Sequence, residues 1–386
     1  MISADALVTA AVEQTGLDDF GGDSYRAGLE VLCDSLSTEA QLSELGALAV
    51  PGQVVGSLAN RLKVVDHAKR HGTAGEAIEA PVFVIGLFRA GTTLLSNLLD
   101  KDPRNRSLLT WEAGDSAPPS TPAEHRSGER VELNRLAQSM LDGLNPGFKA
   151  IHHEEPEGPT ECITVLAADF KALLWESVAN VPSYGEWLLS TDQVSAYEHH
   201  RRTLQVLQSG GVRGRWTLKT PHHALALDAL TAVYPDARLV YLHRDPVEVA
   251  ASAFSLVASL SGTFSEADHR AYIARRWTDV LVACTERVDA FRDARPDVPI
   301  LDIRYLDLLA DPLSTVHDLY GFLGEELTPG AAAAMRAHVD ANPRGRFGAH
   351  RYDVTDFGVS AAELRERFSG YLDRYSLETD VTAPTG

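Results

Sequence analysis

The spacing of apolar positions divides the chain at about residue 77. Residues 1–76 carry apolar residues at intervals of three and four, the period of a helix that buries one face. Glycines and a proline interrupt this pattern at Gly16, Gly21-Gly22 and Pro51, where we expect helices to break. The pattern therefore predicts a helical N-terminal extension over residues 1–76, followed by one α/β domain over residues 77–386.

Beyond residue 77, short apolar runs alternate with helical patterns. Strands alternating with helices favour a parallel sheet that is covered on both faces. We predict a three-layer α/β/α fold with at least four parallel strands and a helical insertion at about residues 129–210. Within it, we expect one helix over residues 129–144 and an entirely helical block over 160–209. The predicted strands cover residues 82–86, 215–219, 237–242 and 299–304.

Residues 82–99 have the sequence of an anion-binding loop. A buried strand is predicted up to Gly86, Ala90 and Gly91 supply a turn of small residues, and leucines recur at helical spacing from Thr92. Unpaired amides and the helix dipole converge where such a turn enters a helix. We therefore expect this stretch to hold a phosphate-like group in a P-loop-like fold.

The loop differs from that of nucleoside triphosphatases. Gly86 and Gly91 have the separation of the G-x-x-x-x-G-K-[ST] motif, but Thr92 occupies the position of the lysine that reaches the terminal phosphates. Arg89, inside the loop, is its basic residue. A P-loop kinase or nucleotide phosphotransferase remains an alternative, although it would need the missing lysine. A non-catalytic nucleotide-binding module is a second alternative.

A second candidate anchor follows the predicted strand 237–242. Asp245 suits a helix N-cap and Glu248 the third helical position, as in a capping box. Ser252 lies two turns further along, so Arg244 and Ser252 could hold one phosphate between them through a guanidinium fork and a hydroxyl. The alternative is a surface ion pair at Arg244 and a helix-packing role for Ser252.

The segment from Phe88 to Leu94 resembles the 5′-phosphosulfate loop of sulfotransferases that use 3′-phosphoadenosine 5′-phosphosulfate (PAPS). The spacing Arg244-x₇-Ser252 is similar to that family's 3′-phosphate site, and the segment from Ile303 to Pro312 resembles its nucleotide-side tyrosine segment. The resemblance spans roughly residues 80–355 and implies a bacterial enzyme that transfers sulfate from PAPS to a hydroxyl acceptor. The PAPS-binding residues that we predict are Arg89, Ala90, Gly91, Thr92, Thr93, Leu94, Arg244, Ser252, Tyr305, Arg344 and Arg346.

The last two of these arginines belong to the densest basic stretch of the chain, residues 342–352, which also contains Arg351. The family closes its 3′-phosphate site with a basic, glycine-containing loop, which is the role that the resemblance implies here. A solvated basic turn is the alternative.

Catalysis of sulfuryl transfer requires charge stabilisation and a general base. Lys219 ends a predicted strand, as the family's sulfate-side lysine does, and together with Arg89 it would neutralise the charge that grows during transfer. Our first candidate for the base is Glu112, 23 residues after Arg89. The next candidates are His222 and His223, followed by His152 and His153. A structural role is the alternative for each.

Composition limits the partners. The formal net charge of −19 over 386 residues argues against nucleic acid and anionic membranes as general partners. The three cysteines are widely separated in the sequence, which indicates buried, reduced thiols. His67 and His71 are four residues apart, but no further metal ligands of matching spacing accompany them, so we expect no metal.

The chain opens without a basic segment, and no apolar run approaches the roughly 20 residues that span a bilayer. We therefore expect a cytoplasmic protein without stable membrane insertion that could still touch a membrane to reach a lipid. The acceptor is left open among small molecules, lipids and glycolipids. The oligomeric state is open as well.

Overall fold

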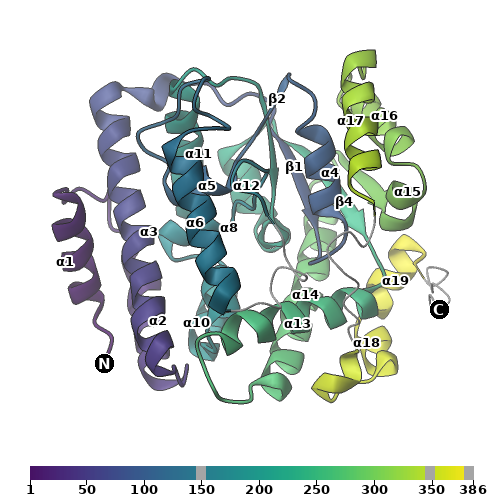
Figure 1. Ribbon diagram of the computed structural model, residues 1–386. Helices are drawn as coiled ribbons and strands as arrows, with labels where there is room; N and C mark the ends of the chain where they lie inside the picture. The colour runs from purple at the N-terminus through teal and green to yellow at the C-terminus, as the bar shows by residue number, and fades with distance from the viewer. Residues whose placement is uncertain (145–153, 344–352, 378–386) are drawn as a thin grey trace.

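A single parallel sheet forms the centre of the computed structural model, which describes residues 1–144, 154–343 and 353–377 (Figure 1). The strand order is β2-β3-β1-β4-β5, and every neighbouring pair is parallel. The four predicted strands are confirmed to within one residue, whereas β2, only three residues long, was not predicted. The strands are β1 (Val82–Gly86), β2 (Asn105–Ser107), β3 (Arg215–Lys219), β4 (Arg238–His243) and β5 (Ile300–Arg304).

Strand β1 is the middle strand and is buried along its whole length. Its Val82 lies opposite Thr217 of β3 on one side and Arg238 of β4 on the other. Because all five strands run in the same direction, their carboxyl ends meet at one edge of the sheet. The loop after β1 therefore lies between the ends of β3 and β4, which deliver Lys219 and Arg244 to that edge.

Successive residues of β1 face two different hydrophobic layers. Val82 and Val84 pack in a cluster with helix α4 (Thr92–Leu99) and with residues of the helices that follow β5. Those helices are α15 (Tyr305–Ala310), α16 (Pro312–Phe322) and α17 (Pro329–Ala341). Phe83 and Ile85 belong to the larger cluster on the opposite face, with α12 (Leu227–Val233), α13 (Pro246–Gly262) and α14 (Arg270–Ala294). The predicted three-layer α/β/α architecture is confirmed.

The N-terminal helices share this larger core. They are α1 (Ala4–Thr15), α2 (Arg26–Thr38) and α3 (Glu44–His71). The expected break at Pro51 is wrong, because α3 continues through this residue. A proline there removes one backbone hydrogen bond, and the buried side chains of Val50, Val54 and Leu58 hold the helix in place on both sides of it.

A buried ion pair fastens α3 to the helical insertion. Arg61 Nη1 lies 2.8 Å from Asp169 Oδ1, and both side chains are almost fully buried.

The helix predicted over residues 129–144 is confirmed as α6 (Glu129–Leu144). The block expected to be all helical is instead a series of short helices with turns between them. It consists of α8 (Ile163–Leu166), η2 (Ala167–Asp169), α9 (Leu174–Val178), α10 (Pro182–Ser190) and α11 (Val194–Ser209).

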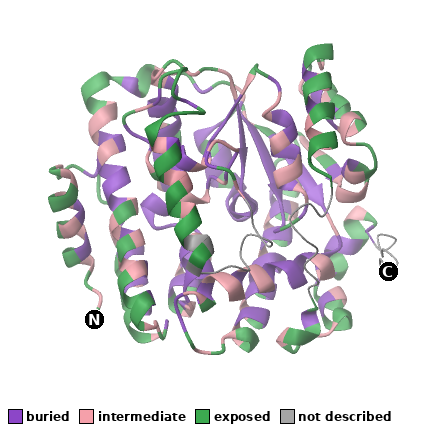
Figure 2. Cartoon of the chain, in the orientation of Figure 1, coloured by how far each residue is buried: buried purple, intermediate pink, exposed green. Residues whose placement is uncertain are grey.

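Burial follows this layering: Figure 2 shows a buried sheet with mostly exposed residues along the outer helices. All three cysteines are buried free thiols, as expected from the sequence. Among the described residues, no helix combines the length and the apolar character required to cross a bilayer. The remaining short helices are η1 (Thr73–Gly75), α5 (Thr110–Gly114), η3 (Pro221–Leu225), η4 (Val354–Phe357), α18 (Ala361–Arg367) and α19 (Ser369–Tyr375).

Candidate active site

The loop between β1 and α4 presents backbone amides at the carboxyl edge of the sheet. Gly91 is the N-cap of α4, with φ of 96°, and no side chain caps the helix there. The first ladder bond runs from the Leu95 amide to the Gly91 carbonyl at 3.2 Å. The amides from Gly91 to Leu94 thus precede the hydrogen-bond ladder of the helix and, together with its dipole, form an anion site.

Two arginines flank this loop. Arg89 is exposed and adopts a positive φ of 63°. Its carbonyl accepts a hydrogen bond of 2.6 Å from Arg244 Nη1, which joins the loop to the end of β4. The Arg244 guanidinium lies 4.3 Å from the centre of the Tyr305 ring, a cation–π contact that holds it over the loop.

The helix start beside Arg244 differs in part from the prediction. Asp245 caps α13 as expected, because its carboxylate accepts from the Val247 amide at 2.8 Å. Glu248 was expected to complete a capping box. Instead, its Oε2 accepts from Arg244 Nε at 2.9 Å and Nη2 at 2.6 Å. Glu248 therefore orients the guanidinium at the site.

Lys219, at the end of β3, is buried between two carboxylates. Its Nζ lies 3.4 Å from Glu161 Oε1 and 3.5 Å from Glu154 Oε1. Burial disfavours the charged amine, but the charges of Glu161 and Glu154 outweigh this and raise the pKa of Lys219. Thr220 donates to Glu161 Oε2 at 3.1 Å, and Thr160 donates to Glu154 Oε2 at 2.6 Å. Lys219 is thus held as a cation.

A cavity of about 360 Å³ lies beside these groups. Its polar lining comes from the β1–α4 loop, Arg244, Tyr305 and the carboxylates of Glu154 and Glu161, whereas the buried Lys219 does not itself line it. Its apolar lining comes mostly from α8, α9, α13 and α14. These apolar residues include Ile163, Leu173, Leu174, Val178, Leu256, Val257, Leu260 and Trp277. The helical insertion therefore contributes to the cavity through α8 and α9, whereas the proline-rich residues 117–122 do not line it.

Most of the predicted anion-binding residues come together here. The lining includes Arg89, Gly91, Thr92, Thr93, Leu94, Arg244 and Tyr305. Ala90 is fully buried in the loop, and Ser252 is buried on α13 with a hydroxyl that has no hydrogen-bond partner. The candidates Arg344, Arg346, Arg351, His152 and His153 lie outside the described residues.

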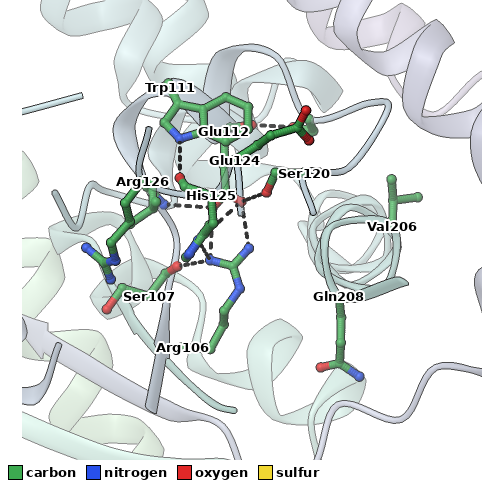
Figure 3. Close-up of polar contacts among 12 residues, drawn as sticks. Arg106, Ser107, Trp111, Glu112, Ser120, Glu124, His125, Arg126, Val206 and Gln208 are labelled. Carbon is green, nitrogen blue, oxygen red and sulfur yellow. Dashed lines mark hydrogen bonds and ion pairs between the residues drawn. The ribbon is translucent and has the colours of Figure 1, made fainter. Parts of the chain in front are cut away.

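Glu112, our first candidate for the general base, lies among Arg106, Ser120 and His125 (Figure 3). It is fully buried and does not line the cavity. Both of its oxygens accept from Arg106, at 2.6 and 3.0 Å, and the Leu109 amide donates to it at 3.2 Å. Burial favours protonation, but the Arg106 charge outweighs this and lowers the pKa of Glu112 to about 2. This carboxylate ties α5 to β2, and its position is incompatible with proton transfer in the cavity.

The two histidine candidates are also buried away from the cavity. His222 Nδ1 accepts from the Leu173 amide at 3.3 Å, and His223 Nδ1 lies 2.9 Å from the Tyr197 hydroxyl. Burial lowers the pKa of His222 to about 3 and that of His223 well below its usual value. Only their neighbour Pro221 lines the cavity. The intervening proline starts the turn η3, which directs both rings into the core.

Sequence reasoning missed the two carboxylates that do face the cavity. Glu154 and Glu161 flank a turn rich in proline and glycine, and an apolar helical segment follows it. That turn could have identified them, because long irregular segments that precede a covering helix often line sites. Nothing in the spacing along the chain indicates that both carboxylates reach Lys219.

Comparison with known proteins agrees with this geometry. A family profile described as "Sulfotransferase family" matches residues 81–329. The crystal structure of sulfotransferase STF1 from Mycobacterium tuberculosis H37Rv is 34% identical and superposes with a TM-score of 0.84, covering 95% of this chain and 98% of that chain. Sulfotransferase STF9 from Mycobacterium avium is 30% identical with a TM-score of 0.87, covering 98% of both chains.

A curated relative is more distant in sequence. The omega-hydroxy-beta-dihydromenaquinone-9 sulfotransferase Stf3 of Mycobacterium bovis is 25% identical over 322 residues, which cover 79% of this chain and 77% of the relative. The same enzyme of Mycobacterium tuberculosis matches equally.

Proposed function

The chain belongs to the sulfotransferase family, and we propose that this enzyme uses PAPS as its donor and the hydroxyl of an apolar, lipid-like molecule as its acceptor. One observation carries the proposal. A single cavity is lined by the anion-binding loop, by Glu154 and Glu161, which contact the buried Lys219, and by a large group of aliphatic and aromatic side chains.

The residues present fit a donor that is anionic at two points. The amides from Gly91 to Leu94, which precede the hydrogen-bond ladder of α4, would bind the 5′-phosphate. Arg244, which lines the cavity, would bind the 3′-phosphate together with Ser252 on α13, whose buried hydroxyl has no hydrogen-bond partner among the described residues.

The apolar wall supports a hydrophobic acceptor. Sugars and nucleosides require many polar partners when they are buried, whereas the far end of this cavity is lined by residues such as Leu174, Val178, Leu256 and Trp277. The curated relative is named for a hydroxylated menaquinone derivative. We propose that this chain accepts a hydroxyl at one end of an extended apolar molecule, with the hydroxyl directed toward Lys219.

The transfer forms one bond and breaks one. The acceptor oxygen bonds to sulfur, the bond between sulfur and the 5′-phosphate oxygen breaks, and adenosine 3′,5′-bisphosphate leaves with that bond's electron pair. Lys219 and Arg89 would stabilise the charge on the sulfate and the leaving oxygen. A general base must take the acceptor's proton.

We assign the base to Glu154 and a positioning role to Glu161. Glu161 is anchored twice at the end of β3, through Lys219 and Thr220, and the amide of the adjacent Cys162 donates to the Lys219 carbonyl at 2.9 Å. This position at the strand end suits a group that fixes the lysine. Glu154 is held as well, by Lys219 at 3.5 Å and by Thr160 at 2.6 Å, but it reaches the cavity from a different segment, and we assign it to the acceptor on that ground.

Ligand titration tests the donor. Calorimetry with adenosine 3′,5′-bisphosphate should show binding that does not depend on Mg²⁺, whereas ATP should bind more weakly with or without Mg²⁺. A preference for ATP with Mg²⁺ would overturn the donor assignment.

Transfer of ³⁵S from labelled PAPS to long-chain alcohols, with matched short-chain and sugar acceptors, tests the acceptor. Equal or faster transfer to the sugar would contradict the apolar assignment.

A further inference from the structure

Helix α6 displays an apolar stripe to solvent. Leu133, Leu136 and Met140 are 57%, 60% and 67% exposed, and their spacing of three and four residues places them on one face of the helix. They are three of the six large hydrophobic side chains that are exposed in the described part of the chain. Single exposed apolar residues are ordinary, but an aligned group is a feature of interaction surfaces.

The inner face of α6 is held mainly by polar contacts. Of its described side chains, Val131 alone is buried, in a small cluster with Leu109 and Trp111. Arg130 pairs with Asp115 at 2.9 Å. Among the described side chains of α6, Arg130 and Arg135 therefore pair with carboxylates of neighbouring segments, while Leu133, Leu136 and Met140 are exposed to solvent.

The stripe lies on a helix that is joined to the wall of the cavity. Arg135, between Leu133 and Leu136, forms ion pairs with Glu155 at 3.3 Å and with Glu157 at 2.8 Å. These glutamates belong to the segment that carries Glu154 and Thr160 into the cavity. A surface that contacts α6 would thus be close to the segment that faces the acceptor.

Charge and area indicate what covers the stripe. Three side chains expose only a few hundred Å², well below the roughly 1,200 Å² that a stable protein interface buries. A net charge of −19 opposes association with a second copy and with anionic surfaces, and Glu132 adds negative charge beside the stripe. Insertion into an uncharged lipid surface requires no opposite charge, and its strength scales with whatever apolar area is buried.

We propose that α6 is a peripheral docking helix that places Leu133, Leu136 and Met140 in the surface of a neutral, zwitterionic bilayer. The choice of a lipid occupant rests on the lipid-like acceptor proposed above, because such a molecule would have to be taken from a membrane. Contact through three side chains is shallow and reversible.

Flotation with phosphatidylcholine vesicles tests this surface. The unmodified protein should float with the vesicles, and substituting Leu133, Leu136 and Met140 together with Gln should lower its partition coefficient by about tenfold or more. Leu48→Gln removes a leucine that is 78% exposed on α3 and is the matched control, with an expected change below about twofold. Vesicles containing phosphatidylglycerol should bind the unmodified protein more weakly than phosphatidylcholine alone.

Further measurements separate this proposal from the proposed function. The triple variant should keep its circular dichroism spectrum, its affinity for adenosine 3′,5′-bisphosphate and its rate with a short, water-soluble alcohol, while losing rate with an acceptor embedded in vesicles. If the unmodified protein transfers sulfate to no acceptor, the proposed function is contradicted, but the docking proposal is not. The docking proposal is overturned if vesicles do not bind, if Leu48→Gln weakens binding equally, or if the triple substitution instead dissociates a dimer in sedimentation experiments.

Discussion

Gly91 and Tyr305 pack so closely that a side chain on residue 91 would meet the tyrosine ring. A Cβ atom placed there lies 2.7 Å from Tyr305 Cδ2. Gly91 also adopts φ of 96°, which side chains disfavour. The same contact therefore explains why the loop needs glycine at this point and why the tyrosine after β5 lies beneath Arg244.

Gly91→Ala should accordingly damage the donor site. Strain and the displaced ring should cost about 1–3 kcal/mol of the free energy of unfolding, and affinity for adenosine 3′,5′-bisphosphate should fall about tenfold or more because the amides lose their alignment. Calorimetric titration and thermal unfolding measure the two effects. Gly56→Ala, in a helix with open space around it, is the control and should be neutral or slightly stabilising. Unchanged affinity in Gly91→Ala would remove the loop from the donor site.

Arg244→Ala should weaken binding of the same bisphosphate by about 1.5–3 kcal/mol, the contribution of hydrogen bonds to a charged group. Arg244→Lys should recover only part of this, since an ammonium lacks the fork that contacts Glu248 and the Arg89 carbonyl. Arg238→Ala, at the opposite end of β4, leaves the site untouched and should bind normally. If both alanine variants bind equally well, Arg244 makes no contact with the donor.

Glu112→Gln should destabilise the protein without abolishing catalysis. Breaking its buried pair with Arg106 should cost about 3–5 kcal/mol at neutral pH. The pKa of Glu112 is lowered on folding from 4.5 to about 2, so its stabilising effect is complete above pH 4.5 and is lost as the pH falls toward 2. The difference in unfolding free energy between the two proteins should shrink over that interval in urea titrations. Glu366→Gln, an exposed substitution, is the control. A variant that stays fully stable but loses turnover would restore Glu112 as the base.

The sequence predicted those parts of the fold that depend on local composition. Apolar runs predicted the strands around β1, and the small residues before Thr92 predicted the anion-binding loop, because both features depend on residues that are adjacent in the sequence. Strand β2 has three residues and no such signal. Pro51 was misjudged because tertiary packing, which is not visible along the chain, supports the helix around it.

Which glutamates lie at the candidate site could not be predicted from the sequence, because it depends on how distant segments pack in the folded protein. Glu112 had a suitable separation from Arg89, yet the burial of Arg106 beside it could not be foreseen. Glu154 and Glu161 are distant from Lys219 in sequence and meet it only because the segment before α8 crosses the end of β3.

These two carboxylates should respond differently to substitution. Glu154→Gln should lower kcat by about 10²–10⁴-fold, the usual contribution of a general base, while affinity for adenosine 3′,5′-bisphosphate stays within about twofold because the loop and Arg244 are unchanged. Each substitution removes one of the two charges that raise the pKa of Lys219, so the alkaline limb of the pH–rate profile should move to lower pH in both variants. Glu161→Gln should show the smaller loss of kcat at neutral pH, and Glu161→Asp should restore part of its profile.

Glu157→Gln provides the matched control, because this glutamate belongs to the same segment but pairs with Arg135 outside the cavity. It should retain nearly full turnover and an unshifted profile. The roles exchange if Glu161→Gln suffers the larger loss of kcat and Glu154→Gln the smaller one. Retention of full activity by both variants would exclude the pair from proton transfer.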